Sequence, residues 1–110
     1  MLHDMKLYKK PFEQIKQGTK TIELRLFDEK RQKIRPMDEI RFTQTQTGET
    51  LTVKVYALHI YADFQELYRH FDKIQLGYDY DEECCYEDMY AYYSMENIEK
   101  YGVLAIELIR

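Results

Sequence analysis

The stretch Gly18-Thr19-Lys20-Thr21-Ile22-Glu23-Leu24-Arg25-Leu26, residues 18–26, decides how the rest of this chain is interpreted. From Thr21 onward apolar and polar residues alternate, which is typical of a strand that is buried on one face. The polar face carries Glu23 and Arg25, and Lys20 stands at the entrance of the strand. Two interpretations stay open at this point: a solvated face with a weak surface ion pair, or a site at which three charged groups converge.

The length and composition are those of one globular domain. A chain of 110 residues can form a modest single core, so we expect one domain over residues 1–110. No apolar run reaches the roughly 18 residues that a membrane helix needs, and the N-terminus lacks the apolar segment of a secretory signal. We therefore expect a cytoplasmic protein without a membrane partner. Adjacent Cys84 and Cys85 fit neither a relaxed disulfide nor a zinc pattern, so we expect reduced thiols on a helix, with a redox role as the alternative.

Charge is distributed unevenly along the chain, whose net charge is −4. Residues 1–41 hold 11 basic against 7 acidic side chains, and residues 42–110 hold 5 against 13. This asymmetry favours one basic and one acidic face, although a scatter of solvated charges is the alternative. Four cations follow the motif strand in a polar loop. We expect these four to contact an RNA backbone: Lys30, Arg31, Lys33 and Arg35.

Alternating residues predict further strands around the motif. A short strand is expected over residues 5–9, and a hairpin over residues 40–43 and 51–55. The apolar pattern continues to residue 62, which is long for a straight strand, so we expect a bulge near residues 56–59. His59 then falls on the face of Val53 and Val55, as a core histidine or as part of a cleft wall. Residues 103–109 are apolar on both faces except for Glu107, which predicts a central, buried strand.

Helices are predicted between the strands by their capping residues. Asp63 with Glu66 forms a capping box, Asp79 or Asp81 can start a helix that runs to about residue 93, and Ser94 can start a last helix to residue 100. On the helix that ends near residue 93, three tyrosines share one face: Tyr86, Tyr90 and Tyr93. We expect this stripe to pack against the sheet, with nucleobase stacking as the alternative, because acidic neighbours would repel phosphate.

The spacing Gly-x-Lys-x-x-Glu-x-Arg, here Gly18, Lys20, Glu23 and Arg25, resembles the signature of the activating signal cointegrator homology (ASCH) domain. The preceding Pro11, Phe12 and Ile15, on a short helix that ends at Gly18, fit the same family. The resemblance implies an α+β fold: a small PUA-like β-barrel of five or six strands with short helices packed outside. This barrel would be similar to the PUA RNA-binding domain, and the motif residues would line a cleft.

The residues that carry chemistry favour binding over catalysis. We find no serine triad, no glycine loop for phosphate and no metal cluster, so we expect neither a cofactor nor a metal. A lysine, a carboxylate and a guanidinium together suit a small polar or planar ligand. We therefore expect RNA or a modified nucleoside as the partner, with Gly18, Lys20, Glu23 and Arg25 as the ligand-binding residues.

Hydrolysis is the alternative function. Some members similar to this family hydrolyse acetylcytidine with the motif lysine and a threonine nucleophile. The position of that threonine is occupied by Glu23 here. If the protein is a hydrolase, Lys20 and Glu23 would form its acid/base pair. Because a neighbouring carboxylate favours the charged form of a lysine, we expect Lys20 to remain a cation and deacetylation to be slow or absent.

Overall fold

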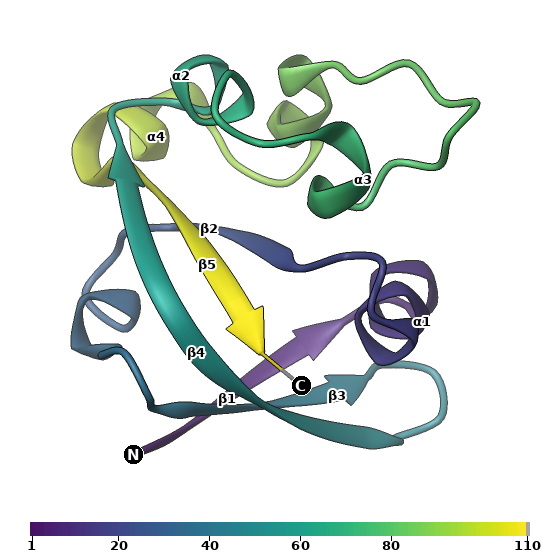
Figure 1. Ribbon diagram of the computed structural model, residues 1–110. Coiled ribbons are helices and arrows are strands. Elements are labelled where there is room, and N and C mark those ends of the chain that lie inside the picture. Colours follow the sequence, from purple (N-terminus) through teal and green to yellow (C-terminus); the bar gives the residue numbers. More distant parts are fainter. Residues whose placement is uncertain (110) are drawn as a thin grey trace.

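The computed structural model describes residues 1–109, and its centre is a curled five-stranded sheet with short helices outside it (Figure 1). The strands are β1 (Leu2–Leu7), β2 (Ile22–Leu26), β3 (Glu39–Gln44), β4 (Thr50–Tyr61) and β5 (Val103–Ile109). Their order is β1-β3-β4-β5-β2; β1 runs parallel to β3, and the other neighbours are antiparallel. The predicted α+β barrel of five or six strands is confirmed, as a half-barrel of five.

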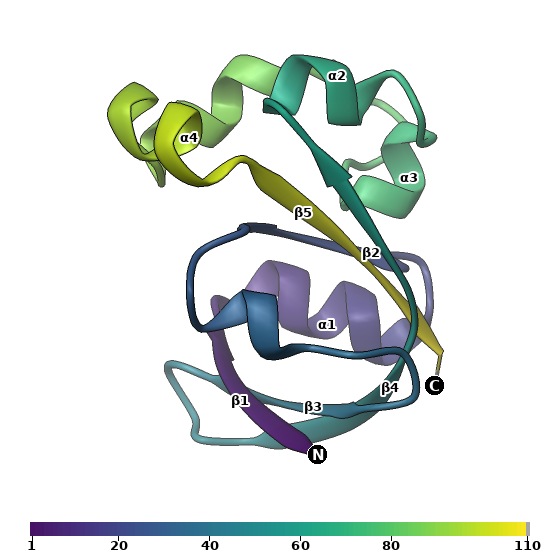
Figure 2. The ribbon, with the colours of Figure 1, turned by 90° about the vertical axis from the view of Figure 1, so that its left-hand side faces the viewer.

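The helices lie outside this sheet. They are α1 (Lys9–Gln17), η1 (Arg31–Lys33), α2 (Phe64–Tyr68), α3 (Lys73–Leu76), η2 (Tyr86–Ala91) and α4 (Met95–Tyr101), of which η1 and η2 are 3-10 helices. Figures 1 and 2 show α2, α3 and α4 together on one side of the sheet, while α1 lies apart from them. Asp63 and Ser94 act as N-caps as predicted: Asp63 Oδ1 accepts from the amide of Glu66 at 2.9 Å, and Ser94 Oγ accepts from that of Asn97 at 3.1 Å. A reciprocal capping box is formed by Asp72 and Gln75 at the start of α3, not by Asp63 and Glu66.

The sheet buries one apolar cluster on each face, and β5 contributes to both. Leu104 and Ile106 belong to the inner cluster, and Val103 and Ala105 to the outer cluster beneath the helices. The inner cluster also holds Met5, Leu7, Phe12, Ile15, Ile34, Ile40, Phe42, Val53 and Val55. The outer cluster also holds Ile22, Leu24, Leu26, Phe64, Leu67, Leu76 and Ile98. This confirms the prediction that residues 103–109 form a central, buried strand.

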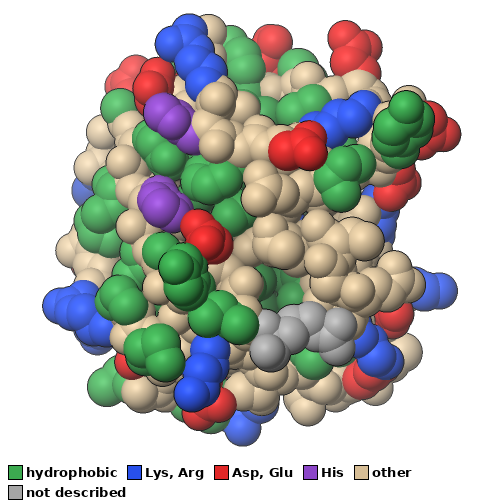
Figure 3. All heavy atoms as spheres, viewed as in Figure 1, with side chains coloured by type: hydrophobic (Ala, Val, Ile, Leu, Met, Phe, Trp, Pro, Cys, Tyr) green, Lys and Arg blue, Asp and Glu red, His purple; other side chains and the backbone are tan. Residues whose placement is uncertain are grey.

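A bulge in β4 changes which face each later residue takes. Val55 pairs with Leu108 and Ala57 with Glu107, so Tyr56 is the extra residue, inside the predicted region. The shift places Leu58 against the inner cluster and His59 on the opposite face, half-exposed, with its Nε2 3.0 Å from Glu107. The expectation that His59 shares the face of Val53 is therefore wrong. The side of the molecule that carries β4 and β5 shows hydrophobic side chains at its surface (Figure 3).

Two further predictions need correction. The helix expected to run from residue 79 or 81 to residue 93 is only the 3-10 helix η2, and Cys84 and Cys85 precede it as free thiols outside any helix. The dense acidic and aromatic residues of this segment fold as turns around tertiary contacts instead. The first strand covers residues 2–7 instead of 5–9, because α1 begins at Lys9 and β1 pairs with β3 over its whole length.

Candidate functional site

The inward positions of β2 are charged, whereas those of the other strands are mostly apolar, with His3 and Gln44 as buried polar exceptions. Glu23 pairs with Ile106 and Arg25 with Leu104, so both motif side chains project from the face that carries the inner cluster. The alternate residues of the strand point to the outer cluster: Ile22, Leu24 and Leu26. Because burying charged groups in an apolar interior is costly, these two positions are a local exception to how the fold is stabilised.

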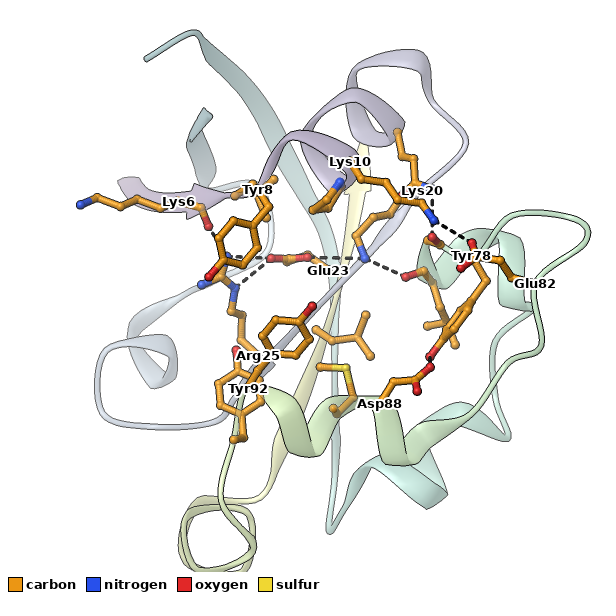
Figure 4. Close-up of a pocket in the computed structure, with 18 of the residues that line it drawn as sticks. Lys6, Tyr8, Lys10, Lys20, Glu23, Arg25, Tyr78, Glu82, Asp88 and Tyr92 are labelled. Atoms are coloured by element: carbon orange, nitrogen blue, oxygen red, sulfur yellow. Dashed lines mark hydrogen bonds and ion pairs between the residues drawn. The ribbon is translucent and has the colours of Figure 1, made fainter. Parts of the chain in front are cut away.

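Glu23 lies between the two cations of the motif (Figure 4). Its Oε2 accepts a hydrogen bond from Arg25 Nε at 2.8 Å, and its Oε1 lies 3.6 Å from Lys20 Nζ. Glu23 is 4% exposed and Lys20 6% exposed, which excludes a solvated strand face with a weak surface ion pair. The structure therefore brings Lys20, Glu23 and Arg25 into one contiguous group.

The pKa values of the two cations shift in opposite directions. Removal from water lowers the pKa of Lys20 from its usual value, and Glu23 offsets this only in part. At Lys20, burial therefore outweighs the neighbouring carboxylate. Burial also opposes the charge of Arg25, but the attraction of Glu23 outweighs it and raises the pKa of the guanidinium. Glu23 thus favours the charged form of Arg25, whereas burial disfavours the charged form of Lys20.

Local backbone contacts fix the position of Lys20. Helix α1 ends at Gly18, whose φ of 90° allows the chain to reverse, and the carbonyl of Gln14 accepts the amides of Gly18, Thr19 and Lys20. At the other end of the side chain, Lys20 Nζ donates to the carbonyl of Leu76 at 2.8 Å. Gly18 therefore shapes the turn; it is not among the described residues that line the cleft.

Gly77 is a contributor that sequence reasoning missed. Its φ is 105°, and a Cβ built there would lie 3.0 Å from Lys20 Cδ and 3.2 Å from Gln14 Oε1. Gln14 Nε2 donates to its carbonyl at 2.9 Å. The glycine lets α3 approach Lys20 closely, a role that its position in the sequence does not reveal, since a glycine there indicates only the end of a helix.

The group forms one wall of a cleft of about 780 Å³ between β2, α1 and the segment from α3 to η2. Many of the other lining side chains are aromatic or charged: Lys6, Tyr8, Lys10, Tyr68, Tyr78, Glu82, Asp88, Tyr92 and Tyr93. Tyr8 is 65% exposed and Tyr92 61% exposed, so two rings stand open at the cleft. Of the predicted stripe, Tyr86 and Tyr93 pack against the outer cluster, and Tyr93 also reaches the cleft. The prediction is wrong for Tyr90, which is exposed and is not part of that cluster.

The four loop cations predicted to contact RNA separate into two pairs. Lys30 and Arg31 line a second, smaller hollow that shares Lys6 and Arg25 with the main cleft. Lys33 and Arg35 are exposed and line neither of these two hollows. The loop is therefore beside the motif strand, but it does not form the rim of the main cleft.

Within residues 1–109, no group of three His, Cys, Asp or Glu side chains is arranged to hold a metal ion. No helix in this part of the chain is long and apolar enough to cross a membrane.

The curled sheet, the outer helices and the inward polar strand together define a PUA-like domain. Residues 5–110 match the model of the ASCH domain family, so the chain belongs to the ASCH family. This family is known for an RNA-binding, PUA-like fold. No curated protein matches the chain.

Solved structures agree with this assignment. The chain is 36% identical to the hypothetical protein PH0355, covering 98% of this chain and 97% of that one with a TM-score of 0.79. It is also 36% identical to protein PF0455 from Pyrococcus furiosus, covering 98% and 96% with a TM-score of 0.70. The ASCH protein from Zymomonas mobilis is 15% identical, with a TM-score of 0.66 over 99% of this chain and 67% of that one, which shows the shared fold.

Proposed function

We propose that the main cleft binds one nucleoside of an RNA, with Lys20, Glu23 and Arg25 recognising the base edge. The observation that carries this proposal is the buried carboxylate between two cations in a cleft whose volume is that of a small-molecule site. A purely structural ion pair would need no such opening beside it.

The polar group offers complementary hydrogen bonding. A carboxylate accepts from an exocyclic amino group, and a lysine or arginine donates to a ring nitrogen or carbonyl. Glu23 beside Lys20 and Arg25 therefore suits a base that presents an amino group next to an acceptor. Because Arg25 already donates to Glu23 and to the carbonyl of Lys6, its guanidinium is held in place before a ligand arrives.

The exposed rings supply the second kind of contact. Stacking of a base on an aromatic side chain contributes about 1–3 kcal/mol and tolerates any base. Tyr8 and Tyr92 are large, exposed and on the cleft, so they are suited to hold the base from outside while the charged group recognises its edge.

The test is calorimetric titration of the protein with cytidine, uridine, adenosine, guanosine and acetylcytidine. At least one nucleoside should bind to wild type, and Glu23→Gln and Tyr92→Leu should each weaken that binding about tenfold or more. Tyr56→Leu is the matched control, because Tyr56 is exposed on β4 and does not line the cleft. Equal weakening by Tyr56→Leu, or no nucleoside binding at all, would refute the proposal.

Hydrolysis is a second candidate, favoured by the lowered pKa of Lys20 next to the carboxylate of Glu23. A lysine that loses its proton more easily can serve as a base. However, Glu23 stands where the related enzymes carry a threonine, and Thr21 is not among the described residues that line the cleft. We therefore still predict slow or absent deacetylation of acetylcytidine.

Chromatography of acetylcytidine incubated with wild type, Lys20→Met and Glu23→Thr decides this point. Wild type should give little product. Efficient wild-type turnover that disappears in Lys20→Met would make hydrolysis the first function, and a gain of turnover in Glu23→Thr would show that the missing hydroxyl is what limits the reaction.

A further inference from the structure

The second hollow, on the outer side of Arg25, is strongly cationic. It measures about 520 Å³, and five of its lining residues are basic: Lys6, Arg25, Lys30, Arg31 and Arg41. Asp4 is the acidic residue among those that line it. The cations come from β1, β2, β3 and the start of η1 with the residue before it, so distant parts of the chain gather positive charge at one place.

Ion pairs neutralise only part of this charge. Arg41 pairs with Asp4 at 2.7 Å, Arg31 with Asp28 at 3.0 Å and Arg25 with Glu23 at 2.8 Å. These three pairs do not include the exposed Lys6 and Lys30. The hollow therefore keeps a net positive charge that is open to solvent, whereas the far side of the main cleft carries Glu82 and Asp88.

Arg31 also carries an unused donor. Its Nη1 donates to Asp28, but its Nε is buried and has no hydrogen-bond partner among the described residues. A buried donor without an acceptor costs free energy, so this guanidinium, which lines the hollow, is held with its hydrogen bonding incomplete. Among the described residues of the hollow, Arg31 Nε is the buried side-chain polar atom that lacks a hydrogen-bond partner.

The two hollows are neighbours. Lys6 and Arg25 line both of them, and Arg25 Nη2 donates to the carbonyl of Lys6 at 2.8 Å. Figure 4 shows the Lys6 side chain extending beyond Arg25, away from Lys20. A ligand that places its base against Glu23 can therefore pass over Arg25 and reach the second hollow with its next phosphate.

We infer that the second hollow binds the phosphodiester of single-stranded RNA that flanks the nucleoside in the main cleft. This inference rests on the proposed function. It adds the path of the RNA over the surface: the base lies over Glu23, and the backbone crosses Arg25 towards Lys30 and Arg41. It also separates the four loop cations, because Lys33 and Arg35 lie outside the hollow.

The test compares two double variants with equal loss of charge. A labelled, mixed-sequence, single-stranded RNA 10-mer is titrated by fluorescence anisotropy over a range of salt concentrations. Lys30→Gln/Arg41→Gln should weaken RNA binding about tenfold or more and reduce the slope of log Kd against log salt by roughly one. Lys33→Gln/Arg35→Gln should stay within about twofold of wild type, and the melting temperature of each variant checks its folding.

Separate titrations distinguish this inference from the proposed function. Nucleoside binding should be the same in wild type and in Lys30→Gln/Arg41→Gln, since the hollow contacts phosphate only. If nucleosides fail to bind while RNA affinity still depends on the hollow, the base site is refuted and the phosphate site stands. Equal losses in both double variants, or inorganic phosphate that binds as tightly as the RNA, would overturn the inference.

Discussion

At the scale of single residues, Glu23 holds the candidate site together because its two oxygens face different cations. Arg25 and Lys20 are both largely withdrawn from water, and a buried cation without a counter-ion is far more costly than a buried pair. The same carboxylate thus serves the stability of the inner face of β2 and, in our proposal, the recognition of a base.

Glu23→Ala should therefore destabilise the protein by about 3–5 kcal/mol, the cost of leaving buried cations unpaired. Glu23→Gln should cost less, because the amide oxygen still accepts from Arg25. The measurement is urea unfolding followed by circular dichroism. Glu29→Ala, at an exposed position just beyond the strand, is the control and should stay within about 0.5 kcal/mol of wild type. An unchanged midpoint in Glu23→Ala would show that the three charges are not coupled.

Asp38 makes stability depend on pH at the opposite end of the barrel. Its Oδ2 lies 2.9 Å from His3 Nε2 and accepts the amide of Arg35 at 2.9 Å, and these bonds hold the pKa of the carboxyl well below its usual 3.8. A carboxyl with a depressed folded-state pKa stabilises the protein above its unfolded-state value, and the stabilisation is lost as the pH falls towards the folded value.

Wild type should accordingly be more stable than Asp38→Asn at pH 5, and the difference should shrink as the pH is lowered from about 4 to about 2. Thermal unfolding of both proteins across this range measures it. A difference that stays constant with pH would mean that Asp38 acts through shape alone and not through its charge.

At the scale of elements, the motif strand depends on two helices that approach it from opposite sides. Helix α1 supplies the Gln14 carbonyl that orders the chain before β2, and α3 supplies the Leu76 carbonyl that receives Lys20. Gly77 permits this approach of α3. The position of Lys20 is therefore a property of three elements and not of the motif alone.

Gly77→Ala should damage the site more than an ordinary glycine substitution does. Both Gly77 and Gly48 have positive φ, so alanine at either position pays about 1–2 kcal/mol of backbone strain. At Gly48 nothing lies within 4 Å of the new Cβ, whereas at Gly77 it meets Lys20 and Gln14. Chemical unfolding should show a larger loss for Gly77→Ala, and ligand titration should show weakening in Gly77→Ala only. Equal effects in the two variants would contradict the proposed role.

Sequence patterns located most elements because alternation and capping are local. The hairpin, α1, α2, α4 and β5 follow from such local signals. The predictions failed where tertiary contacts determine the local structure. One inserted residue, Tyr56, reversed the face of His59, and the tyrosine-rich segment before η2 folded as turns instead of a continuous helix.

At the scale of the whole molecule, the cleft lies beside the two edge strands of the half-barrel, β1 and β2. These strands occupy the ends of the strand order, and the hydrogen bond from Arg25 to the Lys6 carbonyl bridges them. The motif predicted that Lys20, Glu23 and Arg25 would converge. It could not predict Tyr8, Tyr92 or Gly77, because these residues reach the cleft only through long-range folding.

A ligand held across this opening should slow local unfolding of the segments that it joins. Hydrogen exchange of the nucleoside-saturated protein should be slower at residues 18–25 and 76–82 than in the free protein. The β3–β4 hairpin around Gly48 is the internal control and should exchange at an unchanged rate. Protection of that hairpin without protection of residues 18–25 would place the ligand elsewhere.

The pairing of β2 has a consequence for how the protein is made. Ile22 pairs with Glu107 and Leu26 with Val103, so the motif strand has its sheet partner near the opposite end of the chain. Such distant pairing slows folding, because the entropy cost of closing a long loop precedes the stabilising contacts between the strands. During synthesis the β3–β4 hairpin can form before β5 has left the ribosome, when β2 has no strand to pair with. The charged group on β2 therefore remains in water until β5 arrives, and the binding site is assembled only after the β3–β4 hairpin has formed.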